Sequence, residues 1–325
     1  MKDFPPHAEA RAKRYRLDRT NAERDLCELT SSGPCLRGDI VFWGCPYCGG
    51  TGRQEVDVLP GADPLGYRYV QCEGCALVFP WPRLNRDALA MYVNAGWMND
   101  YLEKSLSPAH SNFRPFPEAL FKTFAGCRVL EVGPGEGHLL DYLRRRGGDI
   151  WGVEPNRVRA RRCEAMGAQI VTAPFDSKLL DRPGFPESFD AVLFIESLYH
   201  FFDLKETLET AHRLLRMGGR LVVQAFDLES FPIRCLREAS VGINGLAIPI
   251  NASANVYAKI LTHSGFSVKR LFRCPGDIFS SIGLDRSRLR SRPGFWSLRV
   301  VGKAVDILLR ICGQSRNFLL VAEKS

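Results

Sequence analysis

Val129 to Leu140 reads VLEVGPGEGHLL, an apolar run that passes through one acid into a glycine-rich loop and then into a predicted helix. The loop contains Gly133, Gly135 and Gly137. Glycines permit a tight turn and a close approach of the backbone to a ligand, while the free N–H groups at the helix start offer donors. A second apolar run, Asp149 to Val153, ends at Glu154, where an acid can accept both hydroxyls of a ribose. The pattern predicts a strand–loop–helix–strand unit that binds an adenosine-bearing cofactor.

Charge separates the two cofactor classes that fit this unit, a dinucleotide and S-adenosylmethionine (SAM). Glu131 and Glu136 would both lie near the pyrophosphate of a dinucleotide, where like charges repel. SAM carries an ammonium and a sulfonium, which these acids favour. The dinucleotide fingerprint also requires Gly or Ala where this chain has His138. We therefore expect SAM, held by the acids and glycines of the two turns: Glu131, Gly133, Gly135, Gly137 and Glu154.

Five motifs in register extend this unit to most of the chain. They are Val129 to Gly137, Gly152 to Asn156, Ser188 to Leu193, Leu214 to Leu221 and Ser264 to Phe266. In this order and spacing the chain resembles the class I SAM-dependent methyltransferases over about residues 115–325. The resemblance implies an enzyme with a Rossmann-like α/β fold, whose seven-stranded sheet is mostly parallel. The alternative from the residues alone is a generic doubly wound domain whose glycines only form turns.

Apolar runs rich in β-branched and aromatic residues predict the strands of that sheet. They are expected at 128–132, 149–153, 168–172, 189–195, 220–226, 266–273 and 317–323. Helical segments alternate with them, which is the βαβ signature of a mostly parallel sheet.

Four of the eleven cysteines form two C-x-x-C knuckles, Cys45 with Cys48 and Cys72 with Cys75. Twenty-three residues separate the knuckles, a spacing that a long hairpin accommodates. Four thiolates predict a tetrahedral zinc site with no open position for water, so we expect structural Zn²⁺. The alternative is a redox C-x-x-C pair, but such a pair opens a helix in a thioredoxin-like unit and does not explain two knuckles.

These signals divide the chain into four parts. We expect an N-terminal arm (1–40), a zinc ribbon (41–82), a helical connector (83–125) and a SAM-dependent methyltransferase domain (126–325). A ribbon ahead of such a domain resembles the arrangement in bacterial methyltransferases that act on sugars, glycan precursors and natural products. This resemblance implies methyl transfer to a hydroxyl or carbon of a small molecule.

Catalytic candidates follow the predicted strand 189–195, because ligands bind beyond the carboxyl ends of parallel strands. His200 aligns with a histidine common at this place in the family, and Tyr199 stands where the family more often has Glu. An ordinary imidazole pKa near ~6.5 suits proton removal from a hydroxyl, and the alternative is that His200 packs under the cofactor. Asp176 and Phe175 fall where the family contacts adenine.

Two further sets of residues are open to a role at the acceptor side. Asp227 follows the predicted strand 220–226, and a solvated loop acid is the alternative. Tyr92, Trp97 and Tyr101 of the connector could form a lid, although aromatic residues at such spacing more commonly form core.

The composition and the net charge limit where the protein can be located and what it can bind. The chain is 45% hydrophobic and 25% charged, as in ordinary globular proteins. Met1 to Arg19 is charged and no run is long enough to cross a bilayer, so we expect a cytoplasmic protein with reduced cysteines. The net charge is +8, and residues 269–316 alone hold eleven Lys and Arg against three Asp. A predicted helix, Phe295 to Ile311, has apolar residues over most of its circumference.

That basic segment leaves several partners open. It could pack on its own domain, form a homodimer, contact the inner face of a membrane, or attract a nucleotide- or lipid-linked substrate. A nucleic-acid (RNA) methyltransferase is a rival, but the ribbon lacks interleaved aromatic and basic residues, and we expect no nucleic-acid partner. A non-catalytic SAM-fold partner protein is another rival, which the intact Glu131 and Glu154 disfavour.

Overall fold

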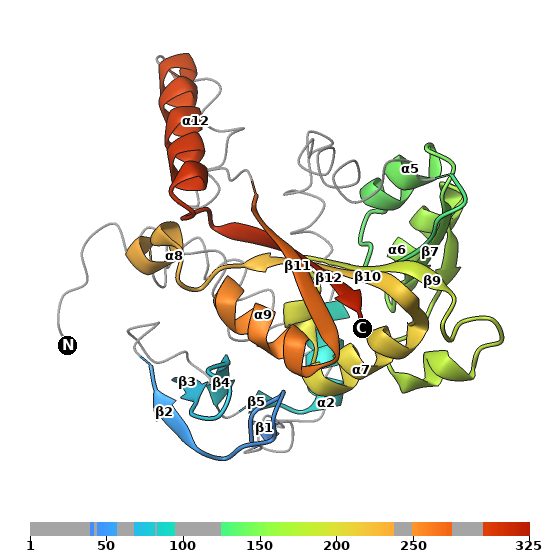
Figure 1. The fold of residues 1–325 in the computed structure, drawn as a ribbon, viewed down its shortest axis with the longest axis horizontal. Helices are drawn as coiled ribbons and strands as arrows, with labels where there is room; N and C mark the ends of the chain where they lie inside the picture. Colours follow the sequence, from blue (N-terminus) through green and yellow to red (C-terminus); the bar gives the residue numbers. More distant parts are fainter. Residues whose placement is uncertain are drawn as a thin grey trace, which may run out of the picture. The chain divides into compact units, whose positions relative to one another are not determined.

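A seven-stranded sheet is the largest sheet of the structure. The computed structural model describes residues 40–41, 44–56, 68–81, 83–94, 125–236, 249–274 and 295–325. Across the sheet the strands lie in the order β11, β12, β10, β9, β6, β7, β8 (Figure 1). Their bounds are β6 Arg128–Val132, β7 Asp149–Val153, β8 Gln169–Val171, β9 Phe189–Ile195, β10 Leu215–Phe226, β11 Phe266–Arg273 and β12 Asn317–Lys324.

Six of these strands run in the same direction and one, β12, is reversed against its neighbours. β8, β7, β6, β9 and β10 pair in parallel, whereas β12 is antiparallel to both β10 and β11. The carboxyl ends of β6, β9 and β10 therefore meet at one edge of the sheet, where the loops after these strands emerge. This Rossmann-like sheet confirms the fold that the motif order predicted.

Helices occupy the connections between the strands (Figure 1). They are α5 His138–Arg144, α6 Arg157–Ala165, η2 Ser177–Asp181, η3 Leu198–His200, α7 Leu204–Leu214, α8 Phe231–Leu236, α9 Ala254–His263 and α12 Phe295–Ile311. Side chains cap several of their amino ends: Asn156 accepts from two backbone N–H groups of α6, and Asp203 accepts from Glu206 N in α7. These caps satisfy donors that the first turn of a helix cannot pair internally.

The core lies on both faces of the central strands. Leu130, Val192 and Phe194 are fully buried in β6 and β9, as continuous apolar runs of parallel strands require. The apolar runs that predicted β6 and β9 from the sequence are therefore also buried in the core of the structure.

β10 is longer than its sequence predicted. We expected a strand from residue 220, but β10 begins at Leu215. The pairing with β9 shifts register between Leu215 and Arg220, so the glycines form a bulge inside the strand. Positive φ at Gly218 (70°) supplies the conformation that the bulge needs.

The ribbon is a small antiparallel sheet in the order β2, β3, β4. Its strands are β2 Arg53–Glu55, β3 Arg68–Cys72 and β4 Val78–Trp81. A separate two-stranded sheet pairs β1 Ile40–Val41 with β5 Arg83–Leu84, and α2 Arg86–Asn94 follows.

The chain divides into two compact units, 1–41 with 84–110 and 42–83 with 111–325. The ribbon and the large sheet belong to the same unit. Tyr47 Oη donates to Ile260 O (3.2 Å), and Val78 and Asn251 exchange two backbone hydrogen bonds of 2.8 Å. The division into arm, ribbon, connector and catalytic domain stays a prediction. Of the expected lid, Trp97, Tyr101 and the side chain of Tyr92 lie outside the described residues.

α12 has the bounds that the sequence predicted. It stands between β11 and β12 in the chain and extends away from the sheet in Figure 1. Within the described parts of the chain, no helix has both the length and the apolar character needed to cross a membrane.

Candidate cofactor-binding and catalytic site

The glycine loop leaves the carboxyl end of β6 with three positive φ angles. They are 70° at Gly133, 56° at Gly135 and 74° at Gly137. A Cβ at Gly133 would lie 3.2 Å from Ser197 Cβ, and one at Gly137 would lie 2.8 Å from Cys163 Sγ. A Cβ at Gly135 would meet nothing within 4 Å, so the loop is open there. The outer two glycines are thus needed for packing, while Gly135 faces free space that a ligand could fill.

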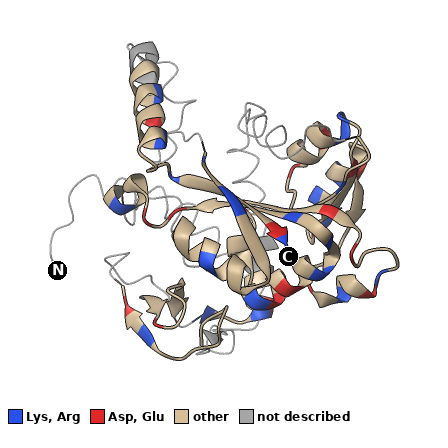
Figure 2. Cartoon of the chain, in the orientation of Figure 1, with Lys and Arg blue, Asp and Glu red and all other residues tan. Residues whose placement is uncertain are grey.

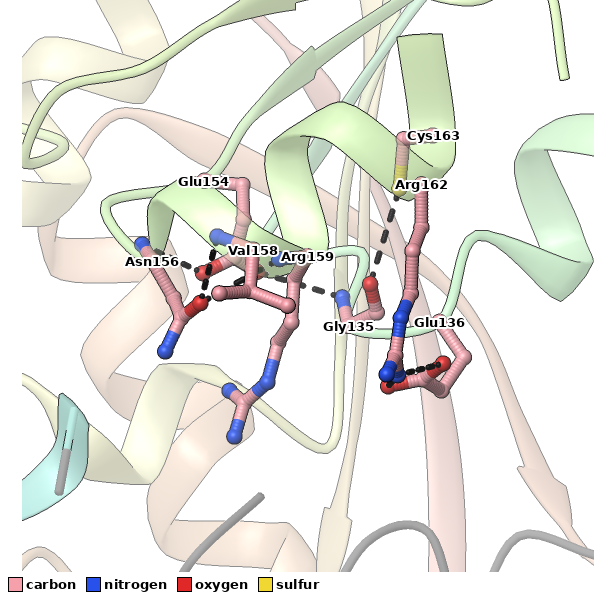
Figure 3. Close-up of polar contacts among 8 residues, drawn as sticks. All are labelled: Gly135, Glu136, Glu154, Asn156, Val158, Arg159, Arg162 and Cys163. Carbon is pink, nitrogen blue, oxygen red and sulfur yellow. Dashed lines mark hydrogen bonds and ion pairs between the residues drawn. The ribbon is translucent and has the colours of Figure 1, made fainter. Parts of the chain in front are cut away.

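Glu154, at the end of β7, holds the glycine loop in place (Figure 3). Its Oε2 accepts from Gly135 N at 3.2 Å and its Oε1 accepts from Asn156 N at 2.9 Å. Burial raises the pKa of this carboxyl, while the two N–H groups oppose that rise. A carboxylate offers about four acceptor positions, so two backbone bonds leave room for ribose hydroxyls. Ribose binding by Glu154 stays a prediction that this geometry permits.

α6 supplies two more contacts to the same loop. Arg162 Nη1 bonds both carboxylate oxygens of Glu136, at 2.7 and 2.9 Å, and Cys163 Sγ lies 3.5 Å from Gly135 O (Figure 3). A loop fixed by its neighbours loses little further entropy when a ligand binds, so the site is pre-organised.

Glu131 is the one acid of the loop region left without a partner. It is 4% exposed, and its Oε2 has no hydrogen-bond partner among the described residues. Burial raises its pKa to about 8, and the negative charge of Glu154 adds to that rise. A buried carboxyl without a partner is costly unless a cation compensates it. The ammonium of SAM is such a cation, so the residues present fit the cofactor.

Arg159 is a buried group that the sequence analysis missed. It lies in the first turn of α6 and is 6% exposed, yet its Nε and Nη2 have no hydrogen-bond partner among the described residues. Burial lowers the pKa of its guanidinium, while Glu154 and Glu136 oppose that effect. In Figure 3 the guanidinium lies apart from both carboxylates. The position of Arg159 in the first turn of α6 could not have revealed its burial, because an arginine in a first turn can also be solvated.

The segment after β9 packs directly against the glycine loop. Ser197 Oγ donates to Val132 O at 2.6 Å, and the Ser197 side chain is the contact that restricts Gly133. Glu196 has a positive φ of 55°, which is strained for a non-glycine residue. The turn thus directs the chain across the cofactor side of the sheet edge.

Glu196 anchors a polar network at the same edge. Its Oε1 accepts from Gln224 Nε2 at 3.2 Å and from Asn317 Nδ2 at 2.6 Å. Asp227, which follows β10, is 3% exposed and forms an ion pair with Arg273. Asp227 is therefore buried and is not the solvated loop acid of the alternative interpretation, while its role at the acceptor side stays a prediction.

The two catalytic candidates lie on η3 in different environments. Tyr199 is 4% exposed and stacks on Phe226, with 5.2 Å between the ring centroids. His200 is half-buried, with its ring centroid 4.6 Å from that of Tyr199. His200 is thus the more accessible of the two, and its role as a base stays a prediction.

The predicted adenine contacts, Asp176 and Phe175, both have local packing roles. Asp176 caps η2 by accepting from Lys178 N at 3.0 Å. Phe175 is buried against Phe194, with ring centroids 5.4 Å apart and nearly perpendicular rings. Cofactor binding by either residue stays a prediction.

The four knuckle cysteines converge as the sequence predicted. Their Sγ atoms all lie within 4.8 Å of one another, with 3.4 Å between Cys45 and Cys75 and 3.4 Å between Cys48 and Cys72. Tetrahedral zinc with bonds of ~2.3 Å sets sulfur atoms ~3.8 Å apart, so this set fits the ion. The hydrogen bond from Cys75 lowers the pKa of the Cys45 thiol to about 5, while the same contact raises the pKa of Cys75. A second thiolate is thus disfavoured until a cation neutralises the cluster.

Comparison with known proteins identifies the family. A family profile described as methyltransferase domain matches residues 101–273, more than half of the chain. An uncharacterized methyltransferase of Geobacillus thermodenitrificans (strain NG80-2) is 30% identical over 154 residues, covering 44% of this chain and 71% of that protein. The O-methyltransferase resE of Aspergillus sclerotiorum is 26% identical over 201 residues, covering 59% of this chain and 75% of that protein.

A solved structure shares the fold. The Burkholderia thailandensis 1,6-didemethyltoxoflavin-N1-methyltransferase, with bound 1,6-didemethyltoxoflavin and S-adenosylhomocysteine, gives a TM-score of 0.51 at 15% identity. The alignment covers 82% of this chain and 98% of that one. With the family match, the sheet order and the glycine loop in agreement, the chain belongs to the methyltransferase-domain family and is a SAM-dependent enzyme.

Proposed function

We propose that this enzyme transfers the methyl group of SAM to a hydroxyl oxygen of a small molecule, such as a sugar, a glycan precursor or a natural product. The observation that carries the cofactor part is the buried Glu131, whose Oε2 has no hydrogen-bond partner within the described parts of the chain, beside a glycine loop that is open at Gly135. The relative named as an O-methyltransferase supports oxygen as the acceptor atom.

The sheet edge supplies what such a transfer requires of the protein. SAM brings a methyl group on a good leaving group, so the protein must align the acceptor and remove its proton. Half-buried His200, on the loop after β9, is the residue we assign to that proton. Buried Tyr199, stacked on Phe226, packs against the His200 ring and positions it.

We also propose that the four-cysteine cluster binds one structural zinc ion. The sulfur spacing supports this, and four thiolates leave no open position for substrate or water. Zinc would hold the ribbon together through Cys45, Cys48, Cys72 and Cys75 and would take no part in methyl transfer.

Transfer of radiolabelled methyl from SAM to a panel of acceptors tests the proposal. The panel includes nucleotide sugars, lipid-linked glycan precursors and phenolic natural products, with tRNA as the comparison. We expect label in at least one hydroxyl compound, in a product that survives the alkaline treatment that cleaves methyl esters. Label in tRNA alone would refute the small-molecule assignment, and SAM binding without transfer to any acceptor would support the non-catalytic alternative.

A further inference from the structure

α12 exposes an apolar face that the methyltransferase reaction does not use. The exposed side chains are Val300 (70%), Val301 (60%), Val305 (37%), Ile307 (48%), Leu308 (60%) and Ile311 (76%). Spacings of three and four residues place them on one broad side of the helix. The buried Gly302 and half-buried Leu309 lie on the opposite side. Apolar faces of this kind are rare on proteins surrounded only by water.

Charged residues border this face. In the cartoon of Figure 2, blue (Lys, Arg) and red (Asp) positions interrupt the otherwise tan ribbon of α12. Lys303 and Arg310 are exposed, seven residues apart, and flank Ile307. The preceding chain adds Arg286, Arg288, Arg290 and Arg292 in sequence. Asp306 lies between Lys303 and Arg310 on the same stripe, but residues 269–316 as a whole hold eleven Lys and Arg against three Asp. The helix therefore combines an apolar face with a basic surrounding segment, the pattern of helices that lie in the surface of an anionic membrane.

The segment that contains α12 connects β11 to β12. Both ends of this segment are hydrogen-bonded at the edge of the sheet where β6, β9 and β10 end, which we call the active edge. Cys274 N donates to Asn317 O at 3.1 Å, where the segment leaves β11 and enters β12. Asp227 N donates to Arg316 O at 2.7 Å, and Asp227 forms its ion pair with Arg273. Asp227 follows the carboxyl end of β10, so α12 extends from the edge that carries the glycine loop and η3.

Charge decides which surface covers this face. In a second copy of the chain, the same face would bring together two segments that each hold eleven Lys and Arg against three Asp, and like charges repel. An anionic bilayer instead attracts Lys303, Arg310 and the arginines before the helix. A helix of seventeen residues with this charge stripe does not span a bilayer, but it can lie along one.

We propose that α12 docks on an anionic lipid bilayer, with Val301, Leu308 and Ile311 among the acyl chains and Lys303 and Arg310 at the headgroups. The active edge of the sheet then lies near the membrane surface. This inference does not depend on the identity of the acceptor.

Vesicle flotation of the full chain tests the proposal. We expect binding to phosphatidylcholine vesicles that contain phosphatidylglycerol, little binding to pure phosphatidylcholine, and release as the salt concentration rises. Leu308→Ser with Ile311→Ser should weaken binding about tenfold or more, because two large side chains lose their burial. Lys303→Gln with Arg310→Gln should weaken it by about 25-fold, at roughly fivefold for each lost cation.

Two matched controls separate docking from general surface effects. Met217 is 66% exposed on the bulge of β10, and Lys205 is exposed on α7. Met217→Ser and Lys205→Gln should bind vesicles like the wild type. Equal binding to both vesicle types, no binding to either, or a dimer in light scattering that Leu308→Ser dissociates would each overturn the proposal.

Discussion

The backbone N–H of Leu204 donates a hydrogen bond to the carbonyl oxygen of Pro46, with 2.9 Å between the two atoms. Pro46 lies inside the first cysteine knuckle, and Leu204 begins α7 directly after the segment that carries His200. Arg83, which is 4% exposed, reaches the same segment by donating to Phe202 O and covering the Phe202 ring at 4.4 Å. The cysteine cluster thus supports the loop on which the proposed base stands.

Removal of zinc should loosen this support. We expect one zinc per chain by elemental analysis, and loss of the ion on Cys72→Ser or on chelation, because metal binding and ribbon folding are linked. Hydrogen exchange at the Leu204 amide should then accelerate by about tenfold or more, since its bond to Pro46 is lost. The Leu193 amide in β9 serves as the internal control and should keep its rate. If exchange at the Leu204 amide stayed slow in the metal-free chain, the zinc-bound ribbon would not be what supports the loop that carries His200.

Gly135→Ala should weaken SAM binding with little effect on folding beyond backbone strain. Gly135 and Gly218 both have positive φ, 56° and 70°, and a Cβ at either would meet nothing within 4 Å. Both alanine variants should therefore lose a similar ~1 to 2 kcal/mol of stability. We expect a loss of SAM affinity by calorimetry in the Gly135 variant alone. If the two variants bound SAM with equal affinity, the cofactor would not bind against Gly135.

Glu131→Gln should stabilise the ligand-free protein at alkaline pH. The pKa of Glu131 is raised from 4.5 to about 8, mainly by burial. Between those values the unfolded chain ionises this carboxyl while the folded chain keeps it protonated, so the free energy of unfolding falls as pH rises. The full effect is roughly 3 to 5 kcal/mol at pH 8 and above, from ~1.4 kcal/mol per pKa unit. Urea unfolding at pH 5 and pH 8 should show a flatter pH dependence in the variant than in the wild type.

SAM binding near pH 7 should release a proton from Glu131. The site holds this carboxyl largely protonated, with its pKa at about 8, and a cation favours the ionised form. The observed binding enthalpy should therefore change with the ionisation enthalpy of the buffer. Glu131→Gln should remove that buffer dependence and weaken binding by ~1 to 3 kcal/mol, as for a lost charged hydrogen bond. Identical proton release in the variant would assign the proton to another group.

His200→Ala should lower turnover by roughly 100-fold or more while SAM affinity stays near that of the wild type, because general-base help acts in the transition state. The measurement pairs single-turnover kinetics on an acceptor from the panel with SAM calorimetry. Weaker SAM binding with nearly normal turnover would instead assign His200 to packing beneath the cofactor. Tyr199 and Glu196 would then be the next residues to test.

The sequence predicted most of the large sheet because its signals are local. β6 and β9 are apolar runs with a turn at each end, and their observed bounds equal the expected ones. The glycine loop and the cysteine knuckles could also be predicted from the sequence, since their function depends on the spacing of residues that are close together in the chain. β10 was predicted too short because a glycine pair forms a turn in one context and a bulge in another.

Contacts between distant segments could not be predicted from such signals. The bond between Tyr47 and Ile260 joins residues 213 positions apart, and Ser197 reaches the end of β6 across 65 positions. The orphaned donors of Arg159 and the network of Glu196 likewise depend on what the fold places beside them. Residue type and spacing specify the elements, whereas the environment of a buried charge follows only from their packing.

The base of the α12 segment has a consequence for how this protein can be altered. Arg273 and Phe318 are paired neighbours in β11 and β12, and the two ends of the segment meet one residue further along. A short turn could replace residues 275–315 and leave an ordinary hairpin, with Arg316 and Asn317 still bonded to Asp227 and Glu196. Replacing residues 275–315 in this way should abolish the proposed vesicle binding while methyl transfer continues.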